Sequence, residues 1–373
     1  MGTASVRIQA RLLFGLALFL TPVCLIAEGQ DQHTAQLKSA PSEVKTNVET
    51  ADNAVRNFRM HVLDLFYQEE YSELESIASR LQSQQTRFRG GAWQLHDFYS
   101  LVSYAGSPTA TDAEWQAQIA KLAQWEKSFP ESPVPRVAMA LTYLGFAWKA
   151  RGSGYANSVT AEGWELYRQR AQSARQVLED AAKMGVNCPE WYLTMHGVAL
   201  AQGWTRSQVD TLVDAALAHE PGYYYIATAH ANYLLPKWHG KAGETEQFAE
   251  QVANRTGGDE GNIEYFQIAF SINCCNGAQA PALTWSRVKQ GFVALDRQYG
   301  INNRQLNAMA FLALRAGDKE AAQALFQRIG SNWDQSVWRS KVRFDASRTG
   351  QPIAGNEPVG PESPAADGSD DIK

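Results

Sequence analysis

Apolar residues recur along this chain at intervals of three and four, the spacing that places side chains on one face of an α-helix. Strand-like alternation of apolar and polar residues, bounded by hairpin turns, is not evident. The repeated interval therefore predicts an all-α fold. Four sets of residues carry it: Leu74, Ile77, Ala78 and Leu81; Val209, Leu212, Val213 and Ala216; Leu306, Met309, Ala310 and Ala313; and Ala322, Leu325, Phe326 and Ile329.

Local signals for helix starts agree with this periodicity. Thr111 followed by Glu114, and Thr205 followed by Gln208, have the spacing of a capping box, in which two side chains satisfy free backbone N–H groups. Pro189 suits a first helical turn, where the missing N–H loses no hydrogen bond. Glycines between the runs predict connectors, and the segments between them amount to about seven helical hairpins of roughly 35 to 45 residues each.

One hairpin of this size cannot bury its own apolar faces, whereas stacked neighbours can, so the period predicts an α-α superhelix. Residues 314–330 resemble the second half of a tetratricopeptide repeat, with Gly317, Ala322 and Phe326 at matching intervals. We expect the small Ala322 to let the paired helix approach and Phe326 to fill the groove beyond it. The other segments match less well, so the prediction is a tetratricopeptide-like solenoid of degenerate helical hairpins.

Three longer phrases resemble a single bacterial family. They are RFRGGAWQLHDFYSLV at residues 87–102, AWKARGSGYANSV at residues 147–159, and YYYIATAHANYLLPKWHG at residues 223–240. These phrases are similar to a bacterial domain-of-unknown-function family, numbered 4034, and the resemblance runs from about residue 58 to about residue 275. It implies a helical-repeat fold and no activity, so the candidate sites below depend on residue chemistry.

The N-terminus has the pattern of a secretion signal, because Arg7 and Arg11 precede an apolar run at residues 12–20. A membrane-spanning helix needs about 20 apolar residues, and this run is shorter, which disfavours an uncleaved anchor. Lipid attachment at Cys24 is also disfavoured, since the residues before it are not small. We expect residues 1–27 to be a cleaved signal peptide and the protein to be periplasmic or secreted, with membrane contact only through the signal or an anchor.

Polar segments flank the helical body. Residues 28–50 are rich in Gln, Lys, Ser, Thr and Glu, the composition of a flexible spacer. Residues 350–373 are rich in Pro, Gly and Asp and cannot build a core, so we expect a disordered acidic tail. Residues 51–349 are then the helical-repeat domain. The formal net charge of −5 and the lack of a basic stripe disfavour a nucleic-acid partner.

The sequence PKWHG interrupts an apolar helical run. Pro236 disfavours helical geometry at the residue before it, and we expect Gly240 to adopt the left-handed conformation that terminates a helix. In one interpretation Trp238 fills the corner between two helices. In the other, Lys237, Trp238 and His239 form a lip that grips a ligand. The large area that a tryptophan buries favours the corner.

The sequence RGSGYANS, which begins at Arg151, is a second candidate site. Gly152 and Gly154 would free backbone amides to form an anion-binding nest, to which Arg151 adds a positive charge. The glycine spacing matches neither a Walker loop nor a dinucleotide fingerprint. This favours the alternative, a loop that only turns the chain and packs Tyr155 back on Trp148.

Three consecutive tyrosines, residues 223–225, follow a Pro-Gly pair. Successive helical residues point about 100° apart, so at most two of these rings face the core. Tyr224 is our candidate for a ring that faces a groove as a stacking platform, although packing is favoured. His196 and His230 lie in apolar helical segments, where we expect core residues bonded to carbonyl groups.

The cysteines allow two interpretations. If Cys24 leaves with the signal, Cys188 could pair with Cys274 or Cys275 in an oxidising compartment. Alternatively, the three thiols pack as small apolar groups. A zinc site is not predicted, because the usual two-residue spacing and a fourth ligand are missing.

No known catalytic motif stands out: the pair at residues 219–220 is followed by Pro-Gly rather than a helical HExxH, and no serine lies in a GxSxG turn. We expect no metal or other cofactor. The leading hypothesis is a helical-repeat protein that binds a protein or peptide partner through its concave surface, without catalysis. Eleven tryptophans keep open an envelope enzyme that acts on glycans in a tryptophan-lined cleft. A structural assembly element is the third alternative.

Overall fold

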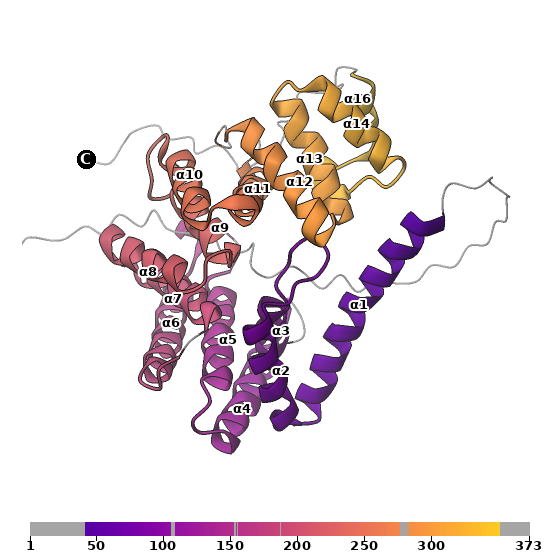
Figure 1. Cartoon of the computed structure of the whole chain (residues 1–373). Coiled ribbons are helices and arrows are strands. Elements are labelled where there is room, and N and C mark those ends of the chain that lie inside the picture. Colours follow the sequence, from indigo (N-terminus) through magenta and orange to yellow (C-terminus); the bar gives the residue numbers. More distant parts are fainter. Residues whose placement is uncertain are drawn as a thin grey trace, which may run out of the picture. The chain divides into compact units, whose positions relative to one another are not determined.

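The computed structural model describes residues 42–105, 109–152, 154, 156–186, 188–276, 281 and 283–350 of the 373-residue chain. Within these ranges the regular secondary structure is helical, apart from one isolated bridge between Arg87 and Trp93 (Figure 1). The predicted all-α fold is thus confirmed. The chain divides into two compact units, Met1–Ile226 and Ala227–Lys373.

The first unit stacks its helices in chain order. Neighbours along the chain pack together, as α5 does on α4 and on α6, and α1, α3, α5 and α7 also contact one another in succession. This stacking of helical hairpins in two layers is the α-α superhelix that the period predicts. The helices are α1 (Ser42–Tyr67), α2 (Tyr71–Gln84), α3 (Gln94–Ser103), α4 (Asp112–Ser128), α5 (Val134–Arg151), α6 (Ala161–Ala182), α7 (Pro189–Gln202) and α8 (Arg206–His219), with a 3-10 turn at Ala156–Ser158. The next helix, α9 (Tyr224–Tyr233), begins in this unit and continues into the second.

The helix starts in this unit follow the local signals in the sequence. Thr111 caps α4 and forms a complete capping box with Glu114, and Thr205 does the same for α8 with Gln208. α7 begins at Pro189, as expected for a first-turn proline. These signals are local in sequence, and for that reason they place the helix boundaries correctly.

The core of the first unit is built around Trp125, which is fully buried. Its indole stacks on the ring of Tyr71, with centroids 5.5 Å apart, and meets the ring of Phe98 edge-on at 6.5 Å. Its Nε1 donates to the Glu75 carboxylate at 2.8 Å, so the one polar atom of the indole is paired. Burial raises the pKa of Glu75, whereas the hydrogen bond from Trp125 lowers it, and burial has the larger effect.

The second unit has the same plan. α10 packs on α11, α11 on α12 and α13 on α14, while α11, α13 and α15 contact one another in succession as a separate layer. The helices that follow α9 are α10 (Glu244–Thr256), α11 (Gly258–Asn276), α12 (Trp285–Tyr299), α13 (Asn303–Arg315), α14 (Lys319–Ile329), α15 (Gln335–Trp338) and α16 (Lys341–Thr349).

The segment that resembles half a tetratricopeptide repeat forms α14 and the turn before it. Ala322 and Phe326 are buried as expected, and Phe326 packs against Trp338 with ring centroids 5.4 Å apart. Asp318 caps the helix by accepting from the backbone N–H of Ala321 at 3.1 Å. Hydrogen bonds to the Asp318 carboxylate lower its pKa to about 2, and the bond from the indole of Trp285 has the largest effect.

The boundaries differ from the sequence prediction in two respects. α1 begins at Ser42, inside the segment assigned as a spacer, because residues 42–50 contain no glycine or proline and continue the helix. The described residues form sixteen α-helices, two more than seven hairpins supply. The predicted signal peptide and residues 351–373 lie outside the described residues.

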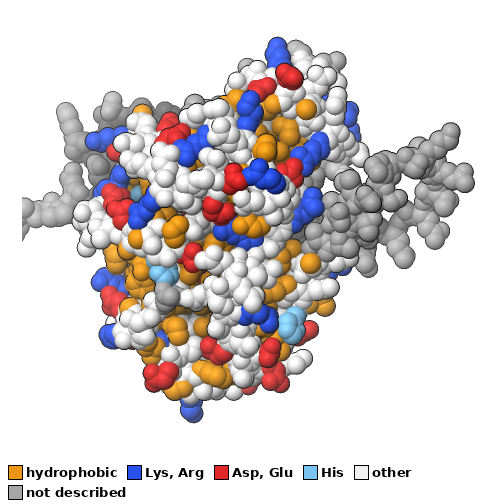
Figure 2. Space-filling model, in the orientation of Figure 1, with side chains coloured by type: hydrophobic (Ala, Val, Ile, Leu, Met, Phe, Trp, Pro, Cys, Tyr) orange, Lys and Arg blue, Asp and Glu red, His pale blue; other side chains and the backbone are white. Residues whose placement is uncertain are grey.

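On the face seen in Figure 2, acidic and basic side chains lie close together at many places, among apolar and uncharged ones. Among the described helices, none has both the length and the apolarity required to cross a bilayer.

The close approach of α11 and α12 depends on Gly291. A Cβ atom on this residue would lie 1.9 Å from the carbonyl oxygen of Asn262 and 2.8 Å from the Cβ of Phe266. We expect Gly291→Ala to force the two helices apart and to lower the free energy of unfolding by about 1–3 kcal/mol, measured by urea denaturation. Gln290→Ala, at an exposed position on the same helix, is the control. Equal stability of the two variants would contradict the backbone contact.

Candidate functional site

The structure brings two of the predicted site residues together at the end of α5. The guanidinium of Arg151 lies 5.8 Å from the ring centroid of Trp148 and 5.9 Å from that of Trp164. Its Nη1 donates to the carbonyl oxygens of Gly152, at 3.0 Å, and Gly154. The loop thus points carbonyl oxygens, which are hydrogen-bond acceptors, toward the buried guanidinium of Arg151. An anion-binding nest would instead point backbone N–H donors toward its ligand. This geometry favours the interpretation of the loop as a turn of the chain.

The aromatic candidates in the first unit are packed or lie outside the described residues. Tyr155 is one that lies outside them. Tyr224 is half-buried and stacks on Tyr225 with ring centroids 4.3 Å apart, and burial raises the pKa of Tyr224 to about 12. Tyr223 is fully buried. The packing interpretation therefore describes these rings better than a free stacking platform does.

Lys237, Trp238 and His239 belong to the second unit and follow the end of α9. Lys237 and His239 are exposed, and Trp238 is half-buried. The Nζ of Lys237 lies 5.3 Å from the ring centroid of Trp238, and His239 stacks on Tyr233 at 4.4 Å. The three residues form a helix corner, and their role in binding stays a prediction.

Gly240 differs from its predicted conformation. Its φ is not in the left-handed region, although that of Gly243 is. The reason for glycine at this position is a close approach, because a Cβ would lie 1.8 Å from the carbonyl oxygen of Leu234. The helix nonetheless ends before Pro236, as expected, with Tyr233 as the last residue of α9.

Two histidines are core residues, as the sequence predicts. His196 and His230 are both buried, and burial lowers the pKa of His196 to about 4. His196 is therefore neutral at pH 7. His230 stacks on Tyr233 with ring centroids 5.3 Å apart.

Cys188 is a buried free thiol whose Sγ lies 3.5 Å from the hydroxyl of Tyr99. Burial raises its pKa to about 11, so the thiol is protonated and unreactive at neutral pH. The side chains of Cys274 and Cys275 lie outside the described residues, and the predicted disulfide stays a prediction.

A buried polar network beside this thiol has no counterpart in the sequence prediction. Glu190, with 0% of its surface exposed, has Oε2 at 3.0 Å from Nδ1 of His96 and accepts a hydrogen bond from the Tyr223 hydroxyl. Burial, followed by the charge of Glu190, raises the pKa of Tyr223. Within the described residues, Glu190 Oε1 has no hydrogen-bond partner. The network connects α3, α7 and Tyr223, the residue before α9, so its first role is to hold these parts of the first unit together.

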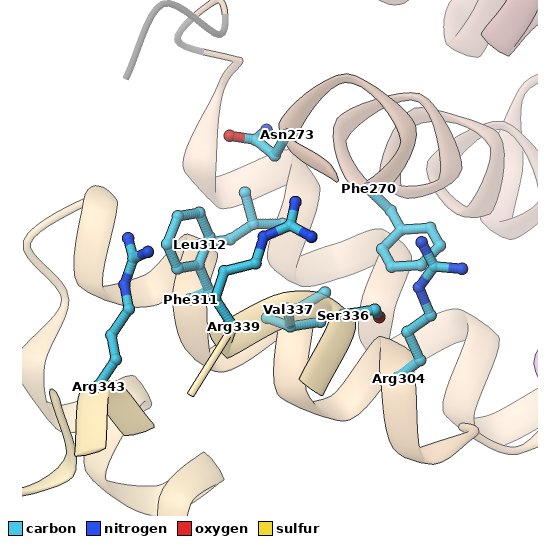
Figure 3. Close-up of a pocket in the computed structure, with 10 residues that line it drawn as sticks. Phe270, Asn273, Arg304, Phe311, Leu312, Ser336, Val337, Arg339 and Arg343 are labelled. Carbon is cyan, nitrogen blue, oxygen red and sulfur yellow. The ribbon is translucent and has the colours of Figure 1, made fainter. Parts of the chain in front are cut away.

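The second unit contains a pocket in the layer formed by α11, α13 and α15, with α16 at one side (Figure 3). Residues from all four helices line it, although they are separated by up to 73 positions in the sequence. They are Phe270 and Asn273 of α11; Arg304, Ala308, Phe311 and Leu312 of α13; Ser336, Val337 and Arg339 at α15; and Arg343 of α16. We call this site the arginine pocket.

The charged side chains that line the arginine pocket in the described ranges are all positive. Three guanidinium groups line it, and none of its lining residues in the described ranges is acidic. Figure 3 shows Arg339 between Arg343 and Arg304. Arg304 lies over the ring of Phe270, 5.5 Å from its centroid, and so the ring steadies a cation at the edge of the pocket.

The remaining lining is mostly apolar. The rings of Phe270 and Phe311 are half-buried, as is Val337, while Leu312 is buried. Arg315 donates to the side-chain oxygen of Asn273 and so adds a fourth guanidinium beside the pocket. Guanidinium groups bind carboxylates in a bidentate manner, and open aromatic rings bury apolar groups. The arrangement suits a ligand that has an anionic group next to an apolar one.

Arg339 has a strained backbone, with a φ of 66°. A non-glycine residue in this region costs about 1–3 kcal/mol, and such strain is found mostly at functional sites. Here it ends α15 after one turn and turns the chain into α16, so that Arg339 and Arg343 both reach the pocket.

The sequence prediction missed this pocket. One local signal was present, since residues 339–348 contain four basic residues and a single aspartate. That signal shows a basic segment but not the phenylalanines that it faces, because Phe270 and Phe311 come from helices far earlier in the chain.

In comparisons with known proteins, no family model, no curated protein and no solved structure matches the chain. The resemblance to the family of unknown function therefore stays a prediction. The function has to be argued from the geometry of the arginine pocket.

Proposed function

We propose that this protein binds a peptide segment of a partner protein, and that the segment places an acidic residue beside an apolar one. The observation that supports this most is the arginine pocket, where three guanidinium groups and two half-buried phenylalanine rings lie together without an acidic lining residue in the described ranges. A short acidic and apolar peptide matches both features.

The position of the pocket supports a peptide rather than a small metabolite. It lies on the layer in which α11, α13 and α15 contact one another across successive hairpins. Stacked helical hairpins use extended surfaces of this kind to bind peptides. An extended peptide could therefore place one or two side chains in the pocket and lay its backbone along the layer.

The strength of this interaction can be bounded. Charge-assisted hydrogen bonds contribute about 1.5–3 kcal/mol each, and a fully buried aliphatic side chain contributes about 1.5–3 kcal/mol. Part of this is lost to the entropy of association, so we expect a short peptide to bind with a Kd on the order of 10–100 µM. Longer partner segments would bind more tightly.

The glycan-enzyme alternative receives no support from this site. An enzyme of that class uses two carboxylates that flank the scissile bond. The described lining of the arginine pocket contains none, and its aromatic residues are phenylalanines rather than tryptophans.

We also propose that the protein acts after export, in the periplasm or outside the cell, on the basis of the predicted signal peptide at residues 1–27. Cell fractionation with a C-terminal epitope tag tests this, since the processed protein should be released with the soluble envelope fraction. Recovery of the unprocessed chain from the cytosol would contradict it.

Arg339→Gly is the sharpest test of the pocket. The substitution removes one guanidinium. It also relieves the backbone strain at this position, because glycine adopts a positive φ without a steric penalty. The free energy of unfolding should therefore stay unchanged or rise by up to about 1 kcal/mol. Affinity for peptides with two aspartates before an isoleucine should fall about tenfold or more, because the variant loses charge-assisted hydrogen bonds. Fluorescence anisotropy with a labelled peptide measures the affinity, and urea denaturation measures the stability.

Matched reagents make this test specific. Arg297→Gln removes an exposed guanidinium on α12, outside the pocket, and should leave peptide affinity unchanged. Peptides with asparagine in place of aspartate should bind weakly to every variant. If Arg339→Gly binds the acidic peptide as well as the unaltered protein does, the pocket is not the binding site.

A further inference from the structure

We infer that residues 351–373 of this same chain occupy the arginine pocket when no partner is bound, so that a partner must displace them. This inference rests on the proposed function of the pocket and names how that site is regulated. The occupant is argued from charge, from side-chain chemistry and from the place where the segment leaves the folded unit.

The charges of the pocket and the segment are complementary. Residues 351–373 contain five acidic residues and one lysine, a net charge of −4. The pocket presents three arginines. When the segment lies in the pocket, its carboxylates are closer to these arginines than the Debye length of about 8–10 Å, so salt screens the attraction only in part. The acidic residues are Glu357, Glu362, Asp367, Asp370 and Asp371.

The end of the segment also matches the apolar part of the pocket. Residues 369–373 read SDDIK, in which two adjacent carboxylates precede an isoleucine. Two adjacent carboxylates can pair with two guanidinium groups, and Ile372 can cover the half-buried rings of Phe270 and Phe311. The chemistry is the same acidic and apolar combination that we propose for a partner.

The attachment point lies near the pocket. α16 ends at Thr349 and is capped by Gly350, seven residues after the pocket residue Arg343. At 1.5 Å per helical residue, these seven residues span about 10 Å. Twenty residues separate Gly350 from Asp370 along the sequence when Asp370 is counted, and a flexible linker of twenty residues has a root-mean-square length of roughly 25 Å. The segment therefore has ample length to return to the pocket.

The tether makes even a weak contact effective. A short flexible linker gives an effective concentration in the millimolar range. If the free segment binds with a Kd on the order of 0.1 mM, the pocket is occupied about ten times more often than it is open. A competing partner peptide then binds about tenfold more weakly than it would to an open pocket.

The test uses the full chain and a variant in which the five acidic residues of the segment become amides: Glu357→Gln, Glu362→Gln, Asp367→Asn, Asp370→Asn and Asp371→Asn. The probe is a fluorescein-labelled peptide with the sequence of residues 365–373, AADGSDDIK. We expect fluorescence anisotropy to show about tenfold tighter binding to the amide variant. Adding Arg343→Gln to this variant should weaken probe binding again.

A second full-length variant controls for net charge. It neutralises five exposed acidic residues of the first unit, Glu73, Glu131, Glu162, Glu165 and Asp214. We expect it to bind the probe as the unaltered chain does. An increase equal to that of the amide variant would show a long-range charge effect and would overturn the inference.

The remaining outcomes separate this inference from the proposed function. If the unaltered chain and the amide variant bind the probe equally well, the segment does not occupy the pocket, but the pocket still binds acidic peptides. If no variant binds the probe, the proposed function itself fails. If release depends on protein concentration and sedimentation shows a dimer, the segment acts on a second copy and occupancy within one chain is wrong.

Discussion

Replacing Trp338 by alanine is expected to lower the free energy of unfolding by about 3–5 kcal/mol, the range typical of a large aromatic side chain removed from a core. Trp338 is 1% exposed and is the last residue of α15. Its ring packs against Phe311, Phe326 and Phe344, with centroids 5.9, 5.4 and 5.6 Å away. Alanine would leave a cavity at the meeting point of α13, α14 and α16.

The same substitution should also damage the arginine pocket. Trp338 anchors the single turn of α15 between two pocket residues, Val337 and Arg339. Its Nε1 donates to Oδ1 of Asn307 at 2.8 Å and so ties this turn to α13. Without the anchor the turn can move, and a displacement of about 1 Å is enough to weaken a site whose groups must converge. We expect acidic-peptide affinity to fall at least tenfold in the fraction that stays folded.

Trp338→Phe is the matched control for this prediction. It keeps most of the apolar contact and loses the bond to Asn307, so it should cost about 1–2 kcal/mol. Urea denaturation followed by far-ultraviolet circular dichroism compares the two variants. A loss for the alanine variant no larger than that for the phenylalanine variant would show that ring packing does not hold α15.

The helices themselves were predictable because the information that specifies them is local. Leu74, Ile77, Ala78 and Leu81 were placed on one face from their spacing alone, and all four are buried on α2. A capping box joins residues three positions apart, and so the start of α4 could be placed at Thr111. The stacking of hairpins followed from the need of each apolar face to be covered.

The polar interior could not be predicted, because its partners are distant in the sequence. Asn307 is fully buried on α13, and its amide donates to the carbonyl oxygen of Asn332 at 3.0 Å. Its side-chain oxygen accepts from Trp338, which lies 31 positions away. The spacing of residues along α13 does not by itself predict that Asn307 faces inward. That follows only from the positions of the neighbouring helices.

The candidate functional residues also divide into those that stand out locally in the sequence and those that only the fold brings together. The prediction weighed conspicuous residues such as Trp238 and Tyr224, which are large and lie two positions from a proline or glycine. The arginine pocket depends on Arg304, Arg339 and Phe270, which come from three helices and form no motif in sequence. An arginine in a solvated segment looks the same in sequence whether it faces water or a phenylalanine ring.

Replacing Glu190 by alanine is expected to lower the free energy of unfolding of the first unit. Glu190→Ala leaves the Tyr223 hydroxyl and Nδ1 of His96 without their partner in a buried site. A buried polar group that loses its partner costs about 1–3 kcal/mol, and the cavity adds to this. We therefore expect the free energy of unfolding to fall by about 2–4 kcal/mol, measured by urea denaturation.

Two further variants decide whether the network is structural. Glu190→Gln keeps the volume, and its side-chain oxygen can take the place of Oε2, which accepts from the Tyr223 hydroxyl and also faces Nδ1 of His96, so it should cost only about 1 kcal/mol. Glu162→Ala, at an exposed position on α6, should change stability by less than about 0.5 kcal/mol. Neither Glu190 variant should alter acidic-peptide affinity in the folded protein, because Glu190 does not line the arginine pocket. If Glu190→Gln keeps full stability but loses peptide binding, the buried carboxylate has a ligand-binding role, and the structural assignment is wrong.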